Sequence, residues 1–344
     1  MDFRRLAEPA GLLYGKTAEE AVKRGYALPL AGGPAAFSCV DLIEDRAHSG
    51  FMPVGDVPAG WQDILARLVG TPPAAGMPEG QQVMGILNIT PDSFSDGGLH
   101  QEAARAVRSG VEQLSAGAGV LDIGGESTRP GAAVISPEEE WARIGPVVQG
   151  LKQQVPDAVL SIDTRNSAVM AQALAAGADV INDVSALTHD PQALPLLAGQ
   201  SCGVVLMHMR GTPATMTQHA VYEDVACDVV RELGARLSVA IQGGIAPARL
   251  SVDPGLGFAK NTDQNVVLLS RLPLLANLGC RVVLGVSRKR MIGELTGVKD
   301  PGGRDAGTQA ASLNALSLGQ SVLRVHAVEG MVQALRVWQR VHTA

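Results

Sequence analysis

From residue 82 onward, short apolar runs alternate along the chain with longer amphipathic stretches. Runs that are apolar throughout are typical of strands buried on both faces, whereas apolar residues spaced three to four positions apart are typical of helices. Most of the apolar runs close on a polar or charged side chain. The pattern predicts eight strands, with ends at 86–88, 120–122, 160–163, 180–183, 204–208, 250–253, 282–287 and 322–326.

The stretches between these runs predict helices. Ser136, Pro137 and Glu139 form a helix start, with an N-cap, a first-turn proline and a capping glutamate. Eight alternating β and α units predict an α/β fold of the (β/α)₈ TIM-barrel type. A doubly wound open sheet is the alternative, but no GxGxxG follows the first strand and no GxxxxGK[ST] occurs.

Residues 1–78 lack this alternation and predict a small N-terminal α/β appendage. Thr17 and Glu20 form a capping box that predicts a short helix, residues 36–44 predict a strand, and residues 60–70 predict a helix with one apolar face. The Pro- and Gly-rich stretch 70–80 predicts a linker. The predicted boundaries are 1–78 for the appendage, whose role is open, and 79–344 for the barrel.

Composition and charge narrow the range of possible partners. The chain has 344 residues and a formal net charge of −6, which argues against a nucleic-acid partner. No apolar run approaches the roughly 18 residues that span a bilayer. The four cysteines form no CxxC pair, so we expect reduced cysteines and a cytoplasmic protein without membrane partners.

The polar strand ends predict one site. In a barrel the carboxyl ends of all strands converge on one rim, so Asn88, Asp163, Asn182 and Asp253 should lie together. Carboxylates and a carboxamide suit a flat heterocycle with several N–H donors. An aspartate at a strand end often only caps the next helix, but several on one rim favour a binding site.

Basic residues follow the last two predicted strands. Arg288, Lys289 and Arg290 come directly after the seventh strand. Arg324 and His326 lie two residues apart at the end of the eighth strand, so they should share a face and form an anion clamp. Two long polar loops, at 89–100 and 124–132, are candidates for lids over the same rim.

These segments together resemble bacterial dihydropteroate synthases in order and spacing. The resemblance covers about residues 82–344 and rests on "MGILNITPDSFSDGG", "LDIGGESTRPGA", "SIDT", "INDVS", "LMHMRGTP", "DPGLGFAKN", "GVSRKRMIG" and "RVH". It implies a (β/α)₈ barrel, usually a homodimer. It also implies a transferase of folate biosynthesis that joins 6-hydroxymethyl-7,8-dihydropterin diphosphate to 4-aminobenzoate, with sulfonamides competing for the aminobenzoate site.

The resemblance also implies roles for single residues. Asp163, Asn182, Asp253 and Lys289 would hold the pterin, with Met207 against its face and Gly285 beside it. Arg324 and His326 would hold the diphosphate, with Asn88 acting through Mg²⁺. Thr128, Arg129, Pro130, Phe258 and Arg290 would surround the aminobenzoate, and Asp92 and Asp96 would lie on the mobile first loop. The catalytic set would be Asn88, Asp163, Lys289, Arg324 and His326.

The implied reaction is a displacement with dissociative character. Mg²⁺ and the cationic side chains would stabilise the departing diphosphate, the pterin methylene would become cationic, and closed loops would exclude water. Pterin should therefore bind before aminobenzoate, and no protein nucleophile is needed. The chain departs from the usual pattern at Arg290, where several members have Ser, and at Leu256, where Phe is common.

Three other functions fit parts of the pattern. A pterin-dependent methyltransferase would share the pterin carboxylates but should lack the anion clamp and the STRPG loop. A catalytically inactive or regulatory pterin-binding protein should have lost an anion or lid residue, and none is missing here. An interaction protein would act through residues 1–78.

Overall fold

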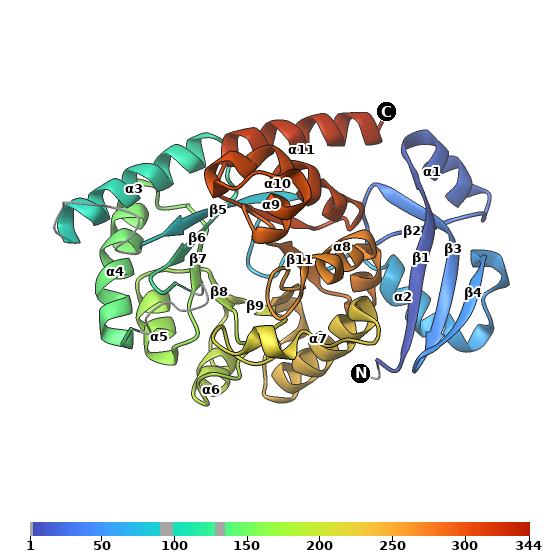
Figure 1. Ribbon diagram of the computed structural model, residues 1–344, viewed down its shortest axis with the longest axis horizontal. Helices are drawn as coiled ribbons and strands as arrows, with labels where there is room; N and C mark the ends of the chain where they lie inside the picture. The colour runs from blue at the N-terminus through green and yellow to red at the C-terminus, as the bar shows by residue number, and fades with distance from the viewer. Residues whose placement is uncertain (1–2, 90–98, 128–134) are drawn as a thin grey trace.

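The larger part of the chain is a closed barrel of eight parallel strands wrapped by helices (Figure 1). The computed structural model describes residues 3–89, 99–127 and 135–344. Pairing of the last strand with the first closes the barrel and confirms the predicted fold. The strands are β5 (Gln82–Asn88), β6 (Val120–Gly124), β7 (Leu160–Asp163), β8 (Val180–Asp183), β9 (Gly203–Met207), β10 (Leu250–Asp253), β11 (Arg281–Leu284) and β12 (Val322–Val325).

Helices connect the strands and cover the outside of the barrel. The start predicted at Ser136 is confirmed, since its hydroxyl accepts a hydrogen bond from the Glu139 N–H at 3.2 Å. None of the helices in the described ranges is long and apolar enough to cross a membrane. They are α3 (Leu99–Ser115), α4 (Pro137–Gln154), α5 (Ser167–Ala175), α6 (Ala193–Ala198), α7 (Val225–Gln242), α8 (Thr262–Ser270), α9 (Arg290–Thr296), α10 (Asp305–Ser312) and α11 (Val328–His342), with a 3₁₀ helix η6 (Leu272–Leu278).

The interior of the barrel is apolar at its base and polar at its mouth. Side chains alternate between the two faces of a strand, so residues two positions apart face the same way. The apolar base layer consists of Met84, Val120, Val180, Val205, Val283 and Val322. Two residues further along the same strands, the inward positions are Ile86, Asp122, Asn182, Met207, Gly285 and Arg324.

The predicted linker at 70–80 closes the base of the barrel. It contains no helix or strand, yet Met77 is buried against the base layer. The fully buried Arg281 donates hydrogen bonds to the carbonyls of Ala74 (2.9 Å), Pro78 (2.8 Å) and Gly80 (2.6 Å). The segment is therefore a fixed part of the barrel rather than a loose connection.

The N-terminal extension is built on an antiparallel sheet, at the right of Figure 1. The predicted strand and second helix are confirmed, but the capping box is wrong. The first helix begins at Gly15, before Thr17, and its N-cap residue Tyr14 makes no side-chain cap. The elements are β1 (Arg5–Tyr14), α1 (Gly15–Lys23), β2 (Leu28–Pro29), β3 (Ala35–Glu44), β4 (Ala47–Pro53) and α2 (Gln62–Val69).

The extension and the barrel share one hydrophobic core. The buried Asn277 of η6 accepts a hydrogen bond from the Ala7 N–H (2.9 Å) and donates one to the Ala7 carbonyl (2.8 Å), so it continues the pairing of β1. Arg271 lies between Glu8 of β1 (2.5 Å) and Asp224 at the start of α7 (2.8 Å). The extension is therefore held to the barrel by apolar packing, backbone pairing and ion pairs.

Candidate functional site

A buried carboxylate, Asp122, organises the mouth of the barrel. It lies on β6 and is fully buried. Its oxygens accept hydrogen bonds from the Ser161 hydroxyl (2.6 Å), the Asn182 amide (3.1 Å) and the Arg324 Nε (2.5 Å). Asp122 thus ties together β7, β8 and β12. It was not among the predicted site residues, although its inward position on β6 could have revealed it.

Arg324 is held between two carboxylates. Its Nη2 donates to Asp163 Oδ2 at 2.8 Å, while its Nε donates to Asp122. Burial would lower the pKa of Arg324, but Asp122 and Asp163 more than offset this and raise it. Burial raises the pKa of Asp163 to about 7, because the charge of Asp122 adds to this effect and Arg324 only partly opposes it. Arg324 is therefore permanently charged and firmly placed.

Asp253 and Lys289 form a second charged pair at the mouth. Asp253 is buried, its Oδ1 accepts the Gly255 N–H at 2.7 Å, and burial raises its pKa. Burial lowers the pKa of Lys289 to about 8, and the charge of Asp253 opposes this shift. Gly285 leaves room between the two charged groups, since a Cβ there would lie 3.4 Å from Asp253 Oδ2 and 3.8 Å from Arg324 Cδ.

The other described residues lie around these pairs. Asn88 is exposed at the end of β5, and its Oδ1 would lie 3.7 Å from a Cβ on Gly124. Met207 is buried at the end of β9. His326 lies just beyond β12, where its Nδ1 is 2.8 Å from the Ser287 hydroxyl. Asn88 and His326 lie two positions beyond the inward residues Ile86 and Arg324 of their strands, at the outer edge of the mouth.

The three basic residues after β11 separate in space. Arg288 pairs with Asp305 of α10 at 2.7 Å. The Arg290 side chain is 74% exposed and lies 3.2 Å from Glu294. Lys289 turns inward, donates to the Leu256 carbonyl, and its Nζ lies 4.7 Å from the centre of the Phe258 ring. Of these three residues, Lys289 is therefore the one that lies at the mouth of the barrel near Asp253.

A buried lysine, which was not predicted, supports the loop after β10. Lys260 Nζ donates to the carbonyls of Gly255 and Phe258, both at 3.0 Å, and lies 2.9 Å from His208 Nδ1. Burial lowers the pKa of Lys260 to about 7 and that of His208 to about 4. The neutral imidazole can accept from the ammonium group. Lys260 thereby fixes the backbone of residues 255–258.

Five predicted residues lie outside the described residues: Asp92, Asp96, Thr128, Arg129 and Pro130. Among the residues that the structure does describe, no group of three His, Cys, Asp or Glu side chains could hold a metal ion. The described part of the mouth therefore offers a metal at most a few separate oxygen ligands, Asn88 among them.

Comparisons with known proteins identify relatives of the barrel. Residues 84–326 match the family model described as pterin binding enzyme. The dihydropteroate synthase of Neisseria meningitidis serogroup C is 48% identical over 263 residues, covering 75% of this chain and 92% of that protein. The dihydropteroate synthase of Xanthomonas albilineans with 4-aminobenzoic acid superposes with a TM-score of 0.72 at 49% identity, covering 77% of this chain and 94% of that one. The same enzyme in complex with 7,8-dihydropteroate gives a TM-score of 0.69 at 46% identity, covering 77% and 94% of the chains.

Proposed function

The chain belongs to the dihydropteroate synthase family, and we propose how the mouth of its barrel carries out the reaction of that family. The enzyme condenses 6-hydroxymethyl-7,8-dihydropterin diphosphate with 4-aminobenzoate to give 7,8-dihydropteroate and diphosphate. The observation that supports the proposed site best is the presence of two charged groups at the mouth of the barrel, Arg324 with its carboxylates and Asp253 with Lys289.

The pterin ring is proposed to bind between these two charged groups. Asp253 and Asn182 offer a carboxylate and an amide to the N–H groups and the carbonyl of the ring. Lys289 donates to a ring acceptor, Met207 packs against the ring face, and Gly285 leaves the space that the ring needs. The raised pKa of Asp163 lets this carboxyl either donate or accept a hydrogen bond near neutral pH.

The diphosphate is proposed to bind at Arg324 and His326. A guanidinium carries five N–H donors, and the bonds to Asp122 and Asp163 use two of them. Arg324 can therefore keep its place and also stabilise the charge of the departing diphosphate. His326 lies on the rim two residues beyond it, and its second ring nitrogen can add a donor when Nδ1 accepts from the Ser287 hydroxyl.

Asn88 is proposed to supply one oxygen ligand to a Mg²⁺ ion that arrives with the diphosphate. Mg²⁺ keeps several waters and takes few protein ligands besides substrate phosphates, so an exposed carboxamide on the rim fits it. When bound, the ion would neutralise charge that develops on the leaving group.

The 4-aminobenzoate is proposed to bind last, next to Phe258 and the loop after β10. That loop reaches the pterin residues through Lys289, which contacts both the Leu256 carbonyl and the Phe258 ring. Pterin should therefore bind first and complete the pocket for 4-aminobenzoate. Thr128, Arg129, Pro130, Asp92 and Asp96 keep their predicted roles in this pocket and its lids, while a homodimer and a cytoplasmic location also stay predictions.

Equilibrium binding of the dihydropterin diphosphate tests the proposed pterin site. Asp253→Asn should weaken binding by about tenfold or more, because a carboxamide cannot accept two N–H bonds as a carboxylate does. The exposed Asp157→Asn is the matched control and should bind as the wild type does. Equal affinity of the Asp253 and Asp157 variants would contradict the assignment.

A further inference from the structure

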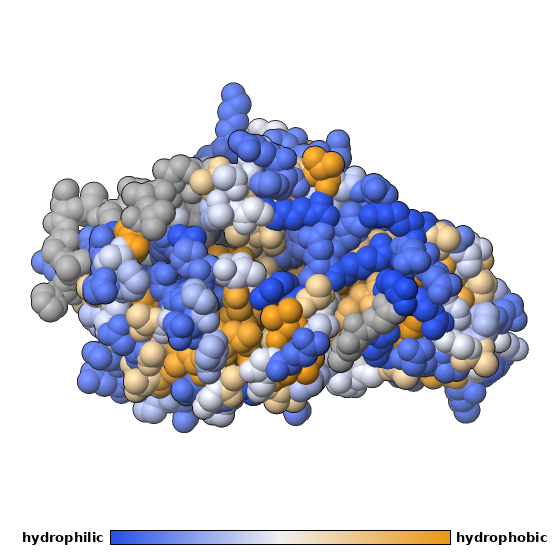
Figure 2. All heavy atoms as spheres, turned by 90° about the horizontal axis from the view of Figure 1, so that it is seen from below, coloured by the Kyte–Doolittle hydropathy of each residue, from blue (hydrophilic) through white to orange (hydrophobic). Residues whose placement is uncertain are grey.

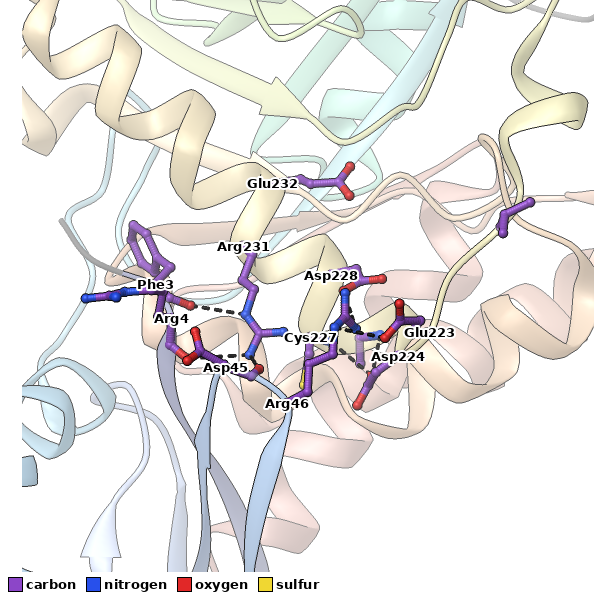
Figure 3. Close-up of polar contacts among 12 residues, drawn as sticks. Phe3, Arg4, Asp45, Arg46, Glu223, Asp224, Cys227, Asp228, Arg231 and Glu232 are labelled. Carbon is purple, nitrogen blue, oxygen red and sulfur yellow. Dashed lines mark hydrogen bonds and ion pairs between the residues drawn. The ribbon is translucent and has the colours of Figure 1, made fainter.

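The N-terminal extension meets the barrel through a row of charged side chains. Arg46, between β3 and β4, has its Nε 2.9 Å from Glu223 and its Nη1 3.5 Å from Asp228, the first just before α7 and the second on it. Figure 3 shows Arg46 beside Glu223, Asp224 and Asp228, and Arg231 reaching from α7 to the backbone of Phe3 and Asp45. In Figure 2 a hydrophilic band crosses the face where the extension meets the barrel.

The row continues from α7 toward the mouth of the barrel. Asp228 is 7% exposed and lies 3.6 Å from Arg210, which follows β9. The Arg210 Nε donates to both oxygens of Glu232 at 2.9 and 3.1 Å. Glu232 Oε2 in turn lies 3.0 Å from the Nε2 of the buried His208.

The last member of the row is Lys260. It lies 2.9 Å from the second ring nitrogen of His208 and donates to the carbonyls of Gly255 and Phe258. The same loop gives its Leu256 carbonyl to Lys289. An unbroken series of hydrogen bonds and ion pairs thus leads from Arg46 on the extension to the backbone that carries Phe258.

Neighbouring charged side chains in this row attract one another. Arg46, Asp228, Arg210 and Glu232 alternate in sign, and each interior member contacts the members on both sides. The Asp228 side chain, between Arg46 and Arg210 in the row, is 8% exposed, so its interactions with these two arginines are less screened than those of a surface pair. Arg210 is also fixed over the Tyr222 ring, 3.9 Å from its centre.

We propose that the N-terminal extension positions the loop 254–261 of the active site through the row Arg46, Asp228, Arg210, Glu232, His208 and Lys260. In this row Lys260 is a positioning residue, since it acts on Phe258 through the backbone of the loop. The inference rests on the proposed placement of 4-aminobenzoate at that loop. It gives residues 1–78 a part in the reaction without a catalytic group of their own.

Steady-state kinetics of Arg46→Glu test the proposal. The matched control is Arg24→Glu, which also reverses a surface arginine of the extension that pairs with a glutamate, Glu20, but lies on α1 outside the row. Arg46→Glu should raise KM for 4-aminobenzoate by about threefold or more, as expected for coupling through a contact network. Affinity for the dihydropterin diphosphate should change less than twofold, roughly the error of such measurements. Arg24→Glu should leave both values unchanged.

A double-mutant cycle between Arg46→Glu and Glu232→Gln checks that the effect travels along the row. The two changes should be non-additive in KM for 4-aminobenzoate, because the second removes the link that the first perturbs. Equal KM values for Arg46→Glu and Arg24→Glu, or strictly additive effects in the cycle, would overturn the proposal. Wild-type protein that forms no dihydropteroate would instead refute the proposed function, so the two failures are distinct.

Discussion

Replacing Asp122 with asparagine removes the charge that holds Arg324 in place. The Asp122 carboxylate is fully buried and accepts the Arg324 Nε at 2.5 Å. An asparagine has the same shape but cannot accept from Arg324, Asn182 and Ser161 together, because one of its two terminal groups is a donor. A hydrogen bond to a charged group contributes about 1.5–3 kcal/mol. A loss of about 2 kcal/mol at the transition state corresponds to about a 30-fold lower rate.

The assay for this variant is diphosphate release at saturating 4-aminobenzoate. We expect kcat for Asp122→Asn to fall by about 30-fold, with a much smaller change in KM for the pterin substrate. Ser161→Ala is the matched control, because it removes a neutral donor to the other oxygen of Asp122 and leaves Arg324 paired, so it should cost less than about threefold. If Asp122→Asn keeps a wild-type kcat while Tm is unchanged, Arg324 does not depend on Asp122 and the reasoning is refuted.

Three further predictions concern charge and the closure of the barrel. The pKa of Lys289 is lowered to about 8, so affinity for the dihydropterin diphosphate should fall between pH 7 and pH 9, and titration calorimetry of Lys289→Met should show no such fall. The pKa of Asp163 is raised to about 7 from about 4 in the unfolded chain, so the stability that this group contributes is present below about pH 4 and is lost as pH rises through 7. The Tm of Asp163→Asn minus the Tm of the wild type should therefore increase from pH 5 to pH 8. A constant difference would contradict this prediction. Arg281→Met leaves the carbonyls of Ala74, Pro78 and Gly80 without their donor and should lower the free energy of unfolding in urea by about 3 kcal/mol, whereas Arg24→Met should change it by less than about 0.5 kcal/mol.

The barrel could be predicted from the sequence because its strands are buried on both faces. Each apolar run is followed by a helix with one apolar stripe, and this alternation has few other solutions. Strand β1 was missed because it contains Glu8, Pro9 and Gly11, which weaken a strand pattern. It forms because β3 and Asn277 pair with its backbone, and these contacts are distant in sequence.

The predicted site shows what alternation along a strand can and cannot tell. Asn182 faces the interior, while the adjacent Asp183 caps its own loop by accepting from the Ser185 N–H at 2.7 Å. Alternation along β8 distinguishes the inward Asn182 from the outward Asp183. The same alternation along β6 would have identified Asp122 as a site residue, because Asp122 shares the inward face with Val120. Arg288 and Arg290 could not be separated from Lys289, because their directions depend on Asp305 and Glu294.

The linker and the extension lay beyond such reasoning. Pro and Gly residues at 70–80 predict a chain without regular structure, which is correct, but not that Arg281 and Met77 lock it into the base of the barrel. A shortened chain that starts near residue 79 would lose Met77. It would also lose two of the carbonyls that accept from Arg281, those of Ala74 and Pro78. The contacts that hold the extension to the barrel join residues that are far apart in the sequence, so no local sequence pattern predicts them.

Diphosphate release coupled to dihydropteroate formation tests the central claim most directly. Wild-type protein with Mg²⁺ and dihydropterin diphosphate should release diphosphate and form dihydropteroate in equal amounts when 4-aminobenzoate is added. Arg324→Ala should lose about 100-fold or more of that rate, because it removes the cation that stabilises the leaving group. Tight binding of the dihydropterin diphosphate by the wild type without any release would contradict the account and leave the chain a pterin-binding protein.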